Sequence, residues 1–324
     1  MYPWLMPYWT RFQQVFESKR LPHAFLLVGP TGIGKSALAT QWASLFLCEQ
    51  PQQNAPCGHC HACLLAKQQS HPDWHIYGAD DAKSIGVDTI RQLSAQLMNS
   101  PQLGRGKVAI ILQAERMTEA AENALLKTLE EPPGNSLLLL LTDSAMKLLP
   151  TIVSRCQVWT LQAEEQQALA WLQQQAPAQT ITPALLQINQ GAPLRTLTYL
   201  NEGGEQQRQA VISALELYRQ QPWTITALTK CCVSAMPTSF EWLSRLLLDA
   251  LKLQQGVTMQ QLQFADHASL LSFLATRPAE ILLGSLQQLL LLKQSLQDMP
   301  SAVPSILFAD WLDQLFYQGI TRVR

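Results

Sequence analysis

The most specific chemical pattern in the sequence is the segment Gly29-Pro-Thr-Gly-Ile-Gly-Lys35-Ser36. It matches the phosphate-binding loop G-x-x-x-x-G-K-[ST], and it lies between an apolar run and a helix-forming stretch, as that motif requires. The glycines let backbone N–H groups surround phosphate oxygens, and the N-terminus of the following helix adds attraction for an anion. We predict that the loop binds ATP or ADP with Mg²⁺, with Lys35 on the β- and γ-phosphates and Ser36 on the metal. The predicted nucleotide-binding residues of the loop are Gly29, Thr31, Gly32, Gly34, Lys35 and Ser36.

Hydrolysis requires more than binding, because an acid must stand near Mg²⁺ and a residue must position the attacking water. These residues normally follow a second buried strand, which is here 107–112, yet the chain continues with Leu112 and Gln113 instead of two acids. Glu115 lies beyond the expected strand end, where a solvated glutamate is the simpler interpretation. Asp143, which follows a third strand, is a second isolated acid. The sequence therefore predicts nucleotide binding with little or no turnover.

Four of the seven cysteines lie between positions 48 and 63. Three of them form overlapping C-x-x-C pairs, and the fourth can return to them across a proline-containing loop. Zn²⁺ prefers four tetrahedral soft ligands, and a site with four protein ligands and no open position is structural. Free thiols or a redox pair are the alternatives. The predicted zinc ligands are Cys48, Cys57, Cys60 and Cys63.

The remaining cysteines and the nearby histidines receive simpler interpretations. An odd, clustered cysteine count favours a reducing compartment over a disulfide framework. His59 and His61 are interpreted as loop residues, because four thiols already satisfy the metal. Cys156, Cys231 and Cys232 are interpreted as small buried side chains.

Composition excludes several classes of protein. The 324 residues include 23 Lys plus Arg and 24 Asp plus Glu, a formal net charge of −1 that does not fit a broad basic surface for nucleic acid. Hydrophobic residues make up 47 %, which excludes disorder for most of the chain. The N-terminal MYPWLMPYWTRF does not read as a targeting signal, and no apolar run is long enough to span a bilayer. We expect a cytoplasmic protein with no membrane partner.

The segments around these motifs predict the sheet that must position them. Short apolar runs, typical of buried strands, alternate with stretches of helical spacing. The predicted strands are 24–28, 107–112, 137–141 and 158–161, and the predicted helices are 35–46, 87–98 and 117–130. Continuous apolar strands separated by helices imply a parallel sheet that is covered on both faces.

The character of the chain changes near residue 162. Strand signals disappear, and Gln, Leu and Ala dominate with helical spacing interrupted by Pro and Gly. We therefore expect three domains. They are an α/β nucleotide-binding domain over 1–162 with the zinc module at 48–63, a small helical lid over 163–204, and a larger helical domain over 205–324.

Two further segments follow the phosphate and cysteine loops in a fixed order. The first is Asn123-Ala-Leu-Leu-Lys-Thr-Leu-Glu-Glu-Pro-Pro133, and the second is Ser154-Arg155-Cys156. This set closely resembles the bacterial clamp-loader branch of the AAA+ ATPases. In the first half of the chain the resemblance rests on specific motifs, and in the helical remainder it rests only on architecture. The resemblance implies an AAA+ P-loop NTPase domain with a parallel sheet and a zinc loop, followed by two all-α domains, the last forming an oligomeric collar.

Two kinds of subunit in that branch share the zinc loop. The gamma/tau motors carry Asp-Glu where this chain, counted back from Asn123, has Leu112 and Gln113. The chain therefore resembles the delta-prime family. That resemblance implies a clamp-loader subunit of the DNA polymerase III holoenzyme that binds delta and gamma/tau, in an assembly that places the sliding clamp on primed DNA.

The resemblance also implies roles for three single residues. Arg155 would act in trans as an arginine finger that stabilises charge on the γ-phosphoryl group in a neighbour's site. Arg195 falls where the family has a nucleotide-sensing arginine, and Thr142 falls where a first sensor residue ends the third strand. The resulting hypothesis is a stator that holds Mg-nucleotide, hardly hydrolyses it, and completes the site of another subunit.

Two alternatives remain open at this point. One is a catalytically active ATPase subunit in which Glu115 replaces the missing acid. The other is a zinc-containing module that binds DNA directly, which the near-neutral charge and the lack of an interleaved basic and aromatic surface disfavour.

Overall fold

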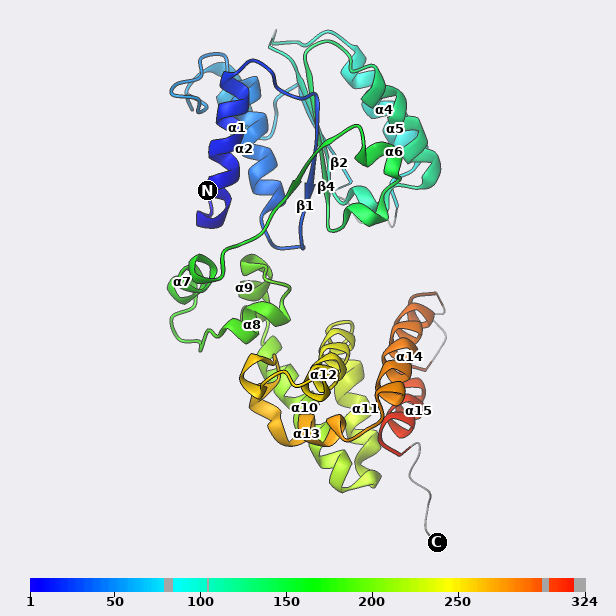
Figure 1. Cartoon of the computed structure of the whole chain (residues 1–324). Helices are drawn as coiled ribbons and strands as arrows, with labels where there is room; N and C mark the ends of the chain where they lie inside the picture. Colours follow the sequence, from blue (N-terminus) through cyan, green and yellow to red (C-terminus); the bar gives the residue numbers. More distant parts are fainter. Residues whose placement is uncertain (79–83, 104, 299–302, 318–324) are drawn as a thin grey trace. The chain divides into compact units, whose positions relative to one another are not determined.

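The computed structural model describes residues 1–78, 84–103, 105–298 and 303–317. It divides into two compact units, which are Met1–Pro177 with Gln190–Arg195, and Ala178–Asn189 with Thr196–Arg324 (Figure 1). The segment 163–204, predicted as a separate lid, is shared between the two units. The division into three domains stays a prediction.

The first unit is built on one parallel sheet with the strand order β2-β3-β4-β1-β5. The strands are β1 (Ala24–Val28), β2 (Trp74–Tyr77), β3 (Lys107–Ile111), β4 (Ser136–Thr142) and β5 (Gln157–Thr160). The four predicted strands are confirmed, with shifts of a single residue at most ends. Three of them, β1, β3 and β4, are buried apolar runs, whereas β5 buries only Trp159. The prediction missed β2, whose WHIY sequence lies at the sheet edge and is nowhere fully buried.

Helices cover both faces of this sheet, with α1 and α2 on one face and α4, α5 and α6 on the other (Figure 1). Thr118 caps the start of α5, because its hydroxyl accepts a hydrogen bond from the Ala121 N–H at 3.3 Å, and the helix ends before Pro132. The helices of this unit are α1 (Met6–Glu17), α2 (Lys35–Leu47), α3 (His61–Lys67), α4 (Val87–Met98), α5 (Glu119–Glu130), α6 (Pro150–Val153) and α7 (Glu165–Gln175).

A cluster of aromatic rings fixes α2 against the sheet. Trp42 of α2 is fully buried and stacks on Phe12 of α1, with ring centroids 4.2 Å apart. It also meets Phe25 of β1 and Trp159 of β5 edge-on, at 5.1 and 4.9 Å. Because α2 begins directly after the phosphate loop, this packing holds the loop in place over the end of β1.

The second unit is helical throughout its described residues, and α9 contributes its first residues to the first unit. Arg208, with a side chain only 5 % exposed, ties this unit together through ion pairs to Glu205 and Asp266. The helices are α8 (Pro183–Ile188), α9 (Pro193–Asn201), α10 (Gly204–Gln220), α11 (Ile225–Ser234), α12 (Thr238–Gln254), α13 (Ala268–Ala275), α14 (Ala279–Asp298) and α15 (Pro304–Tyr317). Among the described residues, no helix combines the length and apolar character needed to cross a membrane.

We expect Trp42→Ala to lower the free energy of unfolding of the first unit by about 3–5 kcal/mol, because truncating a buried tryptophan leaves a cavity among its neighbours. Trp42→Phe keeps an aromatic ring between Phe12 and Trp159 and should cost clearly less. Urea unfolding followed by circular dichroism measures both changes. An unchanged midpoint for Trp42→Ala contradicts this account of the core.

Candidate functional site

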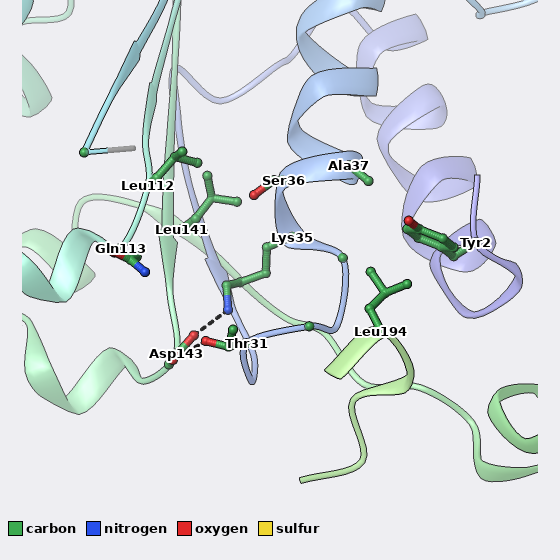
Figure 2. A pocket seen from close by; sticks show the side chains of 13 residues that line it. Tyr2, Thr31, Lys35, Ser36, Ala37, Leu112, Gln113, Leu141, Asp143 and Leu194 are labelled. Carbon is green, nitrogen blue, oxygen red and sulfur yellow. Dashed lines mark hydrogen bonds and ion pairs between the residues drawn. The ribbon is translucent and has the colours of Figure 1, made fainter. Parts of the chain in front are cut away.

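The phosphate loop connects the end of β1 to the start of α2, at the carboxyl edge of the sheet. Gly34 precedes the helix with a φ of +101°, a left-handed conformation that favours glycine. A pocket of about 430 Å³ opens beside the loop, and Figure 2 shows the side chains that line it. The predicted residues that line this pocket are Thr31, Gly32, Gly34, Lys35 and Ser36.

Position 32 requires a glycine, because the start of α9 approaches the loop closely there. Its φ is +84°, and a Cβ at this position would lie 2.6 Å from the Cβ of Arg195 and 2.5 Å from the Arg195 nitrogen. The Gly32 carbonyl also accepts a hydrogen bond from the Leu194 N–H at 3.1 Å. The start of α9 therefore packs directly on the phosphate loop, with Leu194 lining the pocket and Arg195 next to it.

Asp143 is the acid that the structure brings into the pocket. Its Oδ1 lies 2.6 Å from Lys35 Nζ, and its Oδ2 accepts a hydrogen bond from the Thr31 hydroxyl at 2.8 Å (Figure 2). Lys35 Nζ also donates to the carbonyl of Gly29. These contacts follow from strand register, because Val28 of β1 pairs with the last residue of β4 and so places the next residue beside the loop.

Thr142, the predicted sensor residue, is not among the described residues that line the pocket. It is fully buried, and its hydroxyl donates to the Ser144 carbonyl at 3.0 Å. Side chains alternate along a strand, and here Leu141 and Asp143 are the neighbours that reach the pocket. The geometry favours Asp143 as the polar group at the end of β4, and the sensor roles of Thr142 and Arg195 stay predictions.

Leu112 and Gln113 follow β3 at the positions where hydrolysis would require acids, and both line the pocket. Gln113 has a left-handed φ of +51°, and its side-chain oxygen accepts a hydrogen bond from Arg116 at 2.7 Å. Glu115 lies in the turn that follows and is not among the described residues lining the pocket. Among those lining residues, Asp143 is the sole acid.

Tyr2 is a lining residue that the sequence analysis missed. Its ring stacks on Trp4, with centroids 5.2 Å apart, and meets Trp171 of α7 edge-on at 5.8 Å. Trp4 in turn donates from Nε1 to the Ile33 carbonyl at 2.8 Å. No spacing in the sequence signals these contacts, because they join the N-terminal segment to residues that are distant along the chain.

Arg155 lies just beyond α6, on the surface of the first unit. Its side chain is 36 % exposed, and its guanidinium pairs with Glu130 at 2.6 Å and donates to the Thr151 carbonyl at 3.0 Å. At the other end of α6, the nearly buried carboxylate of Glu122 accepts a hydrogen bond from the Leu149 N–H at 2.7 Å. Two glutamates of α5 therefore hold the segment that carries Arg155, a pairing that the sequence analysis did not predict.

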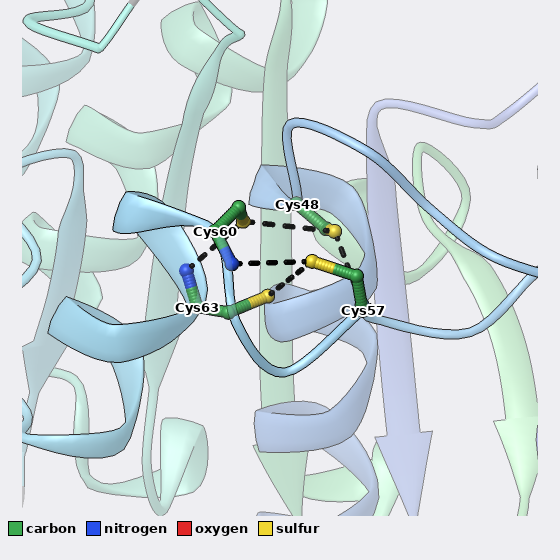
Figure 3. Close-up of side chains that lie close together, drawn as sticks. All are labelled: Cys48, Cys57, Cys60 and Cys63. Carbon is green, nitrogen blue, oxygen red and sulfur yellow. Dashed lines mark hydrogen bonds between the residues drawn. The ribbon is translucent and has the colours of Figure 1, made fainter.

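The four predicted cysteines come together in one cluster, drawn in Figure 3. Their sulfur atoms all lie within 4.8 Å of one another, and two pairs, Cys48 with Cys60 and Cys57 with Cys63, are 3.9 Å apart. Four thiolates around one Zn²⁺ at about 2.3 Å are separated by about 3.8 Å, so the cluster fits a tetrahedral site.

The surroundings of the cluster suit thiolate ligands. Cys60 N–H donates to Cys57 Sγ at 3.3 Å, and a backbone hydrogen bond from His59 contributes most to lowering the pKa of the Cys57 thiol to about 7. Burial raises the pKa of the Cys48 and Cys63 thiols, so deprotonation of the whole set depends on a bound cation. Both loop histidines are exposed, which agrees with their interpretation as non-ligands.

Comparison with known proteins identifies the family. Residues 6–165 match the family described as "DNA polymerase III, delta subunit", and residues 202–315 match "DNA polymerase III, delta subunit, C terminal". DNA polymerase III subunit delta' of Haemophilus influenzae is 37 % identical over 255 residues, which cover 78 % of this chain and 77 % of that protein. The chain belongs to the delta-prime subunit family of bacterial DNA polymerase III. The delta-prime subunit of Pseudomonas aeruginosa is 34 % identical over 297 residues, covering 90 % of this chain and 89 % of its own.

Membership in the delta-prime family confirms the predicted family and fold class, an AAA+ clamp-loader subunit with a parallel α/β domain and a helical remainder. DNA polymerase III subunit tau of Bacillus subtilis is also similar, at 36 % identity over 157 residues, but these cover 48 % of this chain and 28 % of tau. The likeness to delta-prime proteins therefore extends over much more of the chain than the likeness to this tau subunit.

We expect the chain purified without chelator to hold about one zinc ion per molecule, measured by plasma mass spectrometry. Cys60→Ser should lose the metal and lower the melting temperature, because a closed zinc site contributes directly to folding. Cys231→Ser, at a half-buried cysteine outside the cluster, is the matched control and should retain zinc. Metal-free wild-type protein, or zinc retained by Cys60→Ser, contradicts the assignment.

Proposed function

We propose that this delta-prime chain is a clamp-loader stator that holds a nucleotide without turning it over and completes the active site of a neighbour. The observation that carries the proposal is a complete phosphate-loop pocket with Leu112 and Gln113 at the end of β3. Lys35 and Ser36 would hold the phosphates and Mg²⁺. Because β3 offers no carboxylate there to hold the metal and position water, bound ATP would persist.

The partners in this proposal are the delta and gamma/tau subunits, and the assembly as a whole would load the sliding clamp on primed DNA. The formal net charge of −1 supports contact with other proteins over independent DNA binding. The second unit also exposes large apolar side chains on α14, including Leu290 and Leu291 at 54 and 63 %. Exposed apolar patches of this kind mark protein interfaces, so we assign 205–324 to a collar, while 163–204 stays a predicted lid.

Arg155 would supply the arginine finger, and the sheet itself argues that it acts in trans. The phosphate loop follows β1, whereas Arg155 precedes β5, and these two strands pair in parallel. The two sites therefore lie at opposite ends of neighbouring strands, separated by about 13 Å of strand at ~3.3 Å per residue. An arginine in this position does not serve the pocket of its own chain, but its exposed guanidinium can enter the pocket of a neighbour.

We expect Arg155→Ala to lower the ATPase activity of the reconstituted loader while leaving assembly intact. Turnover at the neighbouring site should fall by about 10³-fold, the usual contribution of an arginine finger. Arg91→Ala, which removes another exposed, carboxylate-paired arginine of this unit, should leave activity unchanged. Clamp-stimulated phosphate release and gel filtration measure the two properties. Unaltered ATPase in Arg155→Ala refutes the finger.

The competing function is an active ATPase in which Glu115 replaces the missing acids. Its Oε2 atom is buried without a hydrogen-bond partner in the described structure, but the residue is outside the pocket lining. We expect single-turnover assays on the isolated chain to show negligible ATP hydrolysis, and Glu115→Gln to change nothing. Turnover that is lost in both Lys35→Ala and Glu115→Gln would establish the ATPase instead.

A further inference from the structure

Asp143 places a negative charge where the phosphate loop is built to receive one. Its Oδ1 lies 2.6 Å from Lys35 Nζ, and its Oδ2 accepts a hydrogen bond from Thr31 at 2.8 Å. The Lys35 side chain is only 12 % exposed, and it also donates to the Gly29 carbonyl. The loop lysine is therefore paired with a carboxylate of its own chain.

This carboxylate affects a diphosphate and a triphosphate differently. An ammonium group has three donors, so Lys35 can contact a β-phosphate while it keeps a bond to Asp143. A γ-phosphate would have to share the same ammonium with the carboxylate and stand close to its negative charge. Two like charges a few ångströms apart repel, also at a site where the carboxylate side chain is 38 % exposed.

We propose that Asp143 is a specificity-determining residue that makes this pocket prefer a nucleoside diphosphate over a triphosphate. The inference rests on the proposed nucleotide binding by the loop, and it adds that the nucleotide held is the diphosphate. A diphosphate leaves the contacts of Asp143 with Lys35 and Thr31 in place, whereas the terminal phosphate of a triphosphate displaces them. The stator would then keep one nucleotide state while its neighbours cycle.

A different role for this carboxylate would be to bind Mg²⁺ in place of the acids that are missing at Leu112 and Gln113. The contacts favour the selectivity role. Both oxygens of Asp143 are engaged by donors of the phosphate loop itself, and Ser36, the expected metal ligand, is not among its described partners. The two roles give opposite results when the charge is removed.

Calorimetric titration of the full chain with Mg-ADP and Mg-ATP tests the proposal. We expect wild-type protein to bind Mg-ADP at least about tenfold more tightly than Mg-ATP, a difference of about 1.4 kcal/mol. Asp143→Asn keeps the size of the side chain and removes the charge, so the Mg-ATP affinity should rise by about tenfold while the Mg-ADP affinity changes little. Asp88→Asn, which removes a charge from a side chain that is 91 % exposed on α4, is the charge-matched control and should behave as wild type.

Three results separate the possible failures. An unchanged ratio of the two affinities in Asp143→Asn overturns the selectivity role, and a weaker Mg-ATP affinity overturns it in favour of a metal ligand. Both results leave nucleotide binding by the loop intact, provided that Lys35→Ala abolishes the signal. If neither nucleotide binds to the wild type or to any variant, and the melting temperatures are unchanged, then nucleotide binding itself is overturned. The proposed function is overturned with it.

Discussion

The parallel pairing of β1 with β4 on one side and β5 on the other is the constraint on which the sites of this chain depend. Because the strands run in one direction, whatever follows β1 and β4 meets at one edge of the sheet. The phosphate loop and Asp143 are therefore neighbours there. The Arg155 segment, which precedes β5, is carried to the other end of the strands. The same register therefore places the proposed nucleotide site and the proposed arginine finger at opposite ends of the strands.

The electrostatics of the pocket agree with a holding role over a catalytic one. The end of β3 carries an apolar and an amide side chain, while the sole described acid of the lining sits at the end of β4 and binds the loop lysine. An acid tied to Lys35 and Thr31 is poorly placed to polarise water, but it is well placed to sense the charge of the phosphates. On the far side, Glu122 and Glu130 of α5 hold the segment that presents Arg155.

Features that depend on local sequence could be predicted. Apolar runs predict the buried strands, and the spacing of cysteines within a single loop predicts the cysteine cluster. The structure contains both. Features that depend on contacts between distant segments could not. Asp143 was visible as an acid after a strand, but its importance follows from the adjacency of β4 to β1, which the sequence does not state. The contact of Tyr2 with the pocket was missed for the same reason, whereas β2 was missed because its sequence lacks the apolar run of a buried strand.

The central claim is that this subunit contributes Arg155 to catalysis in the loader but does not contribute its own phosphate loop. The most direct test compares Arg155→Ala with Lys35→Ala in the same reconstituted complex, by clamp-stimulated ATPase. We expect a loss of activity in Arg155→Ala and near wild-type activity in Lys35→Ala, because on this proposal the pocket of this chain does not turn ATP over. Loss of activity in Lys35→Ala together with full activity in Arg155→Ala would contradict it.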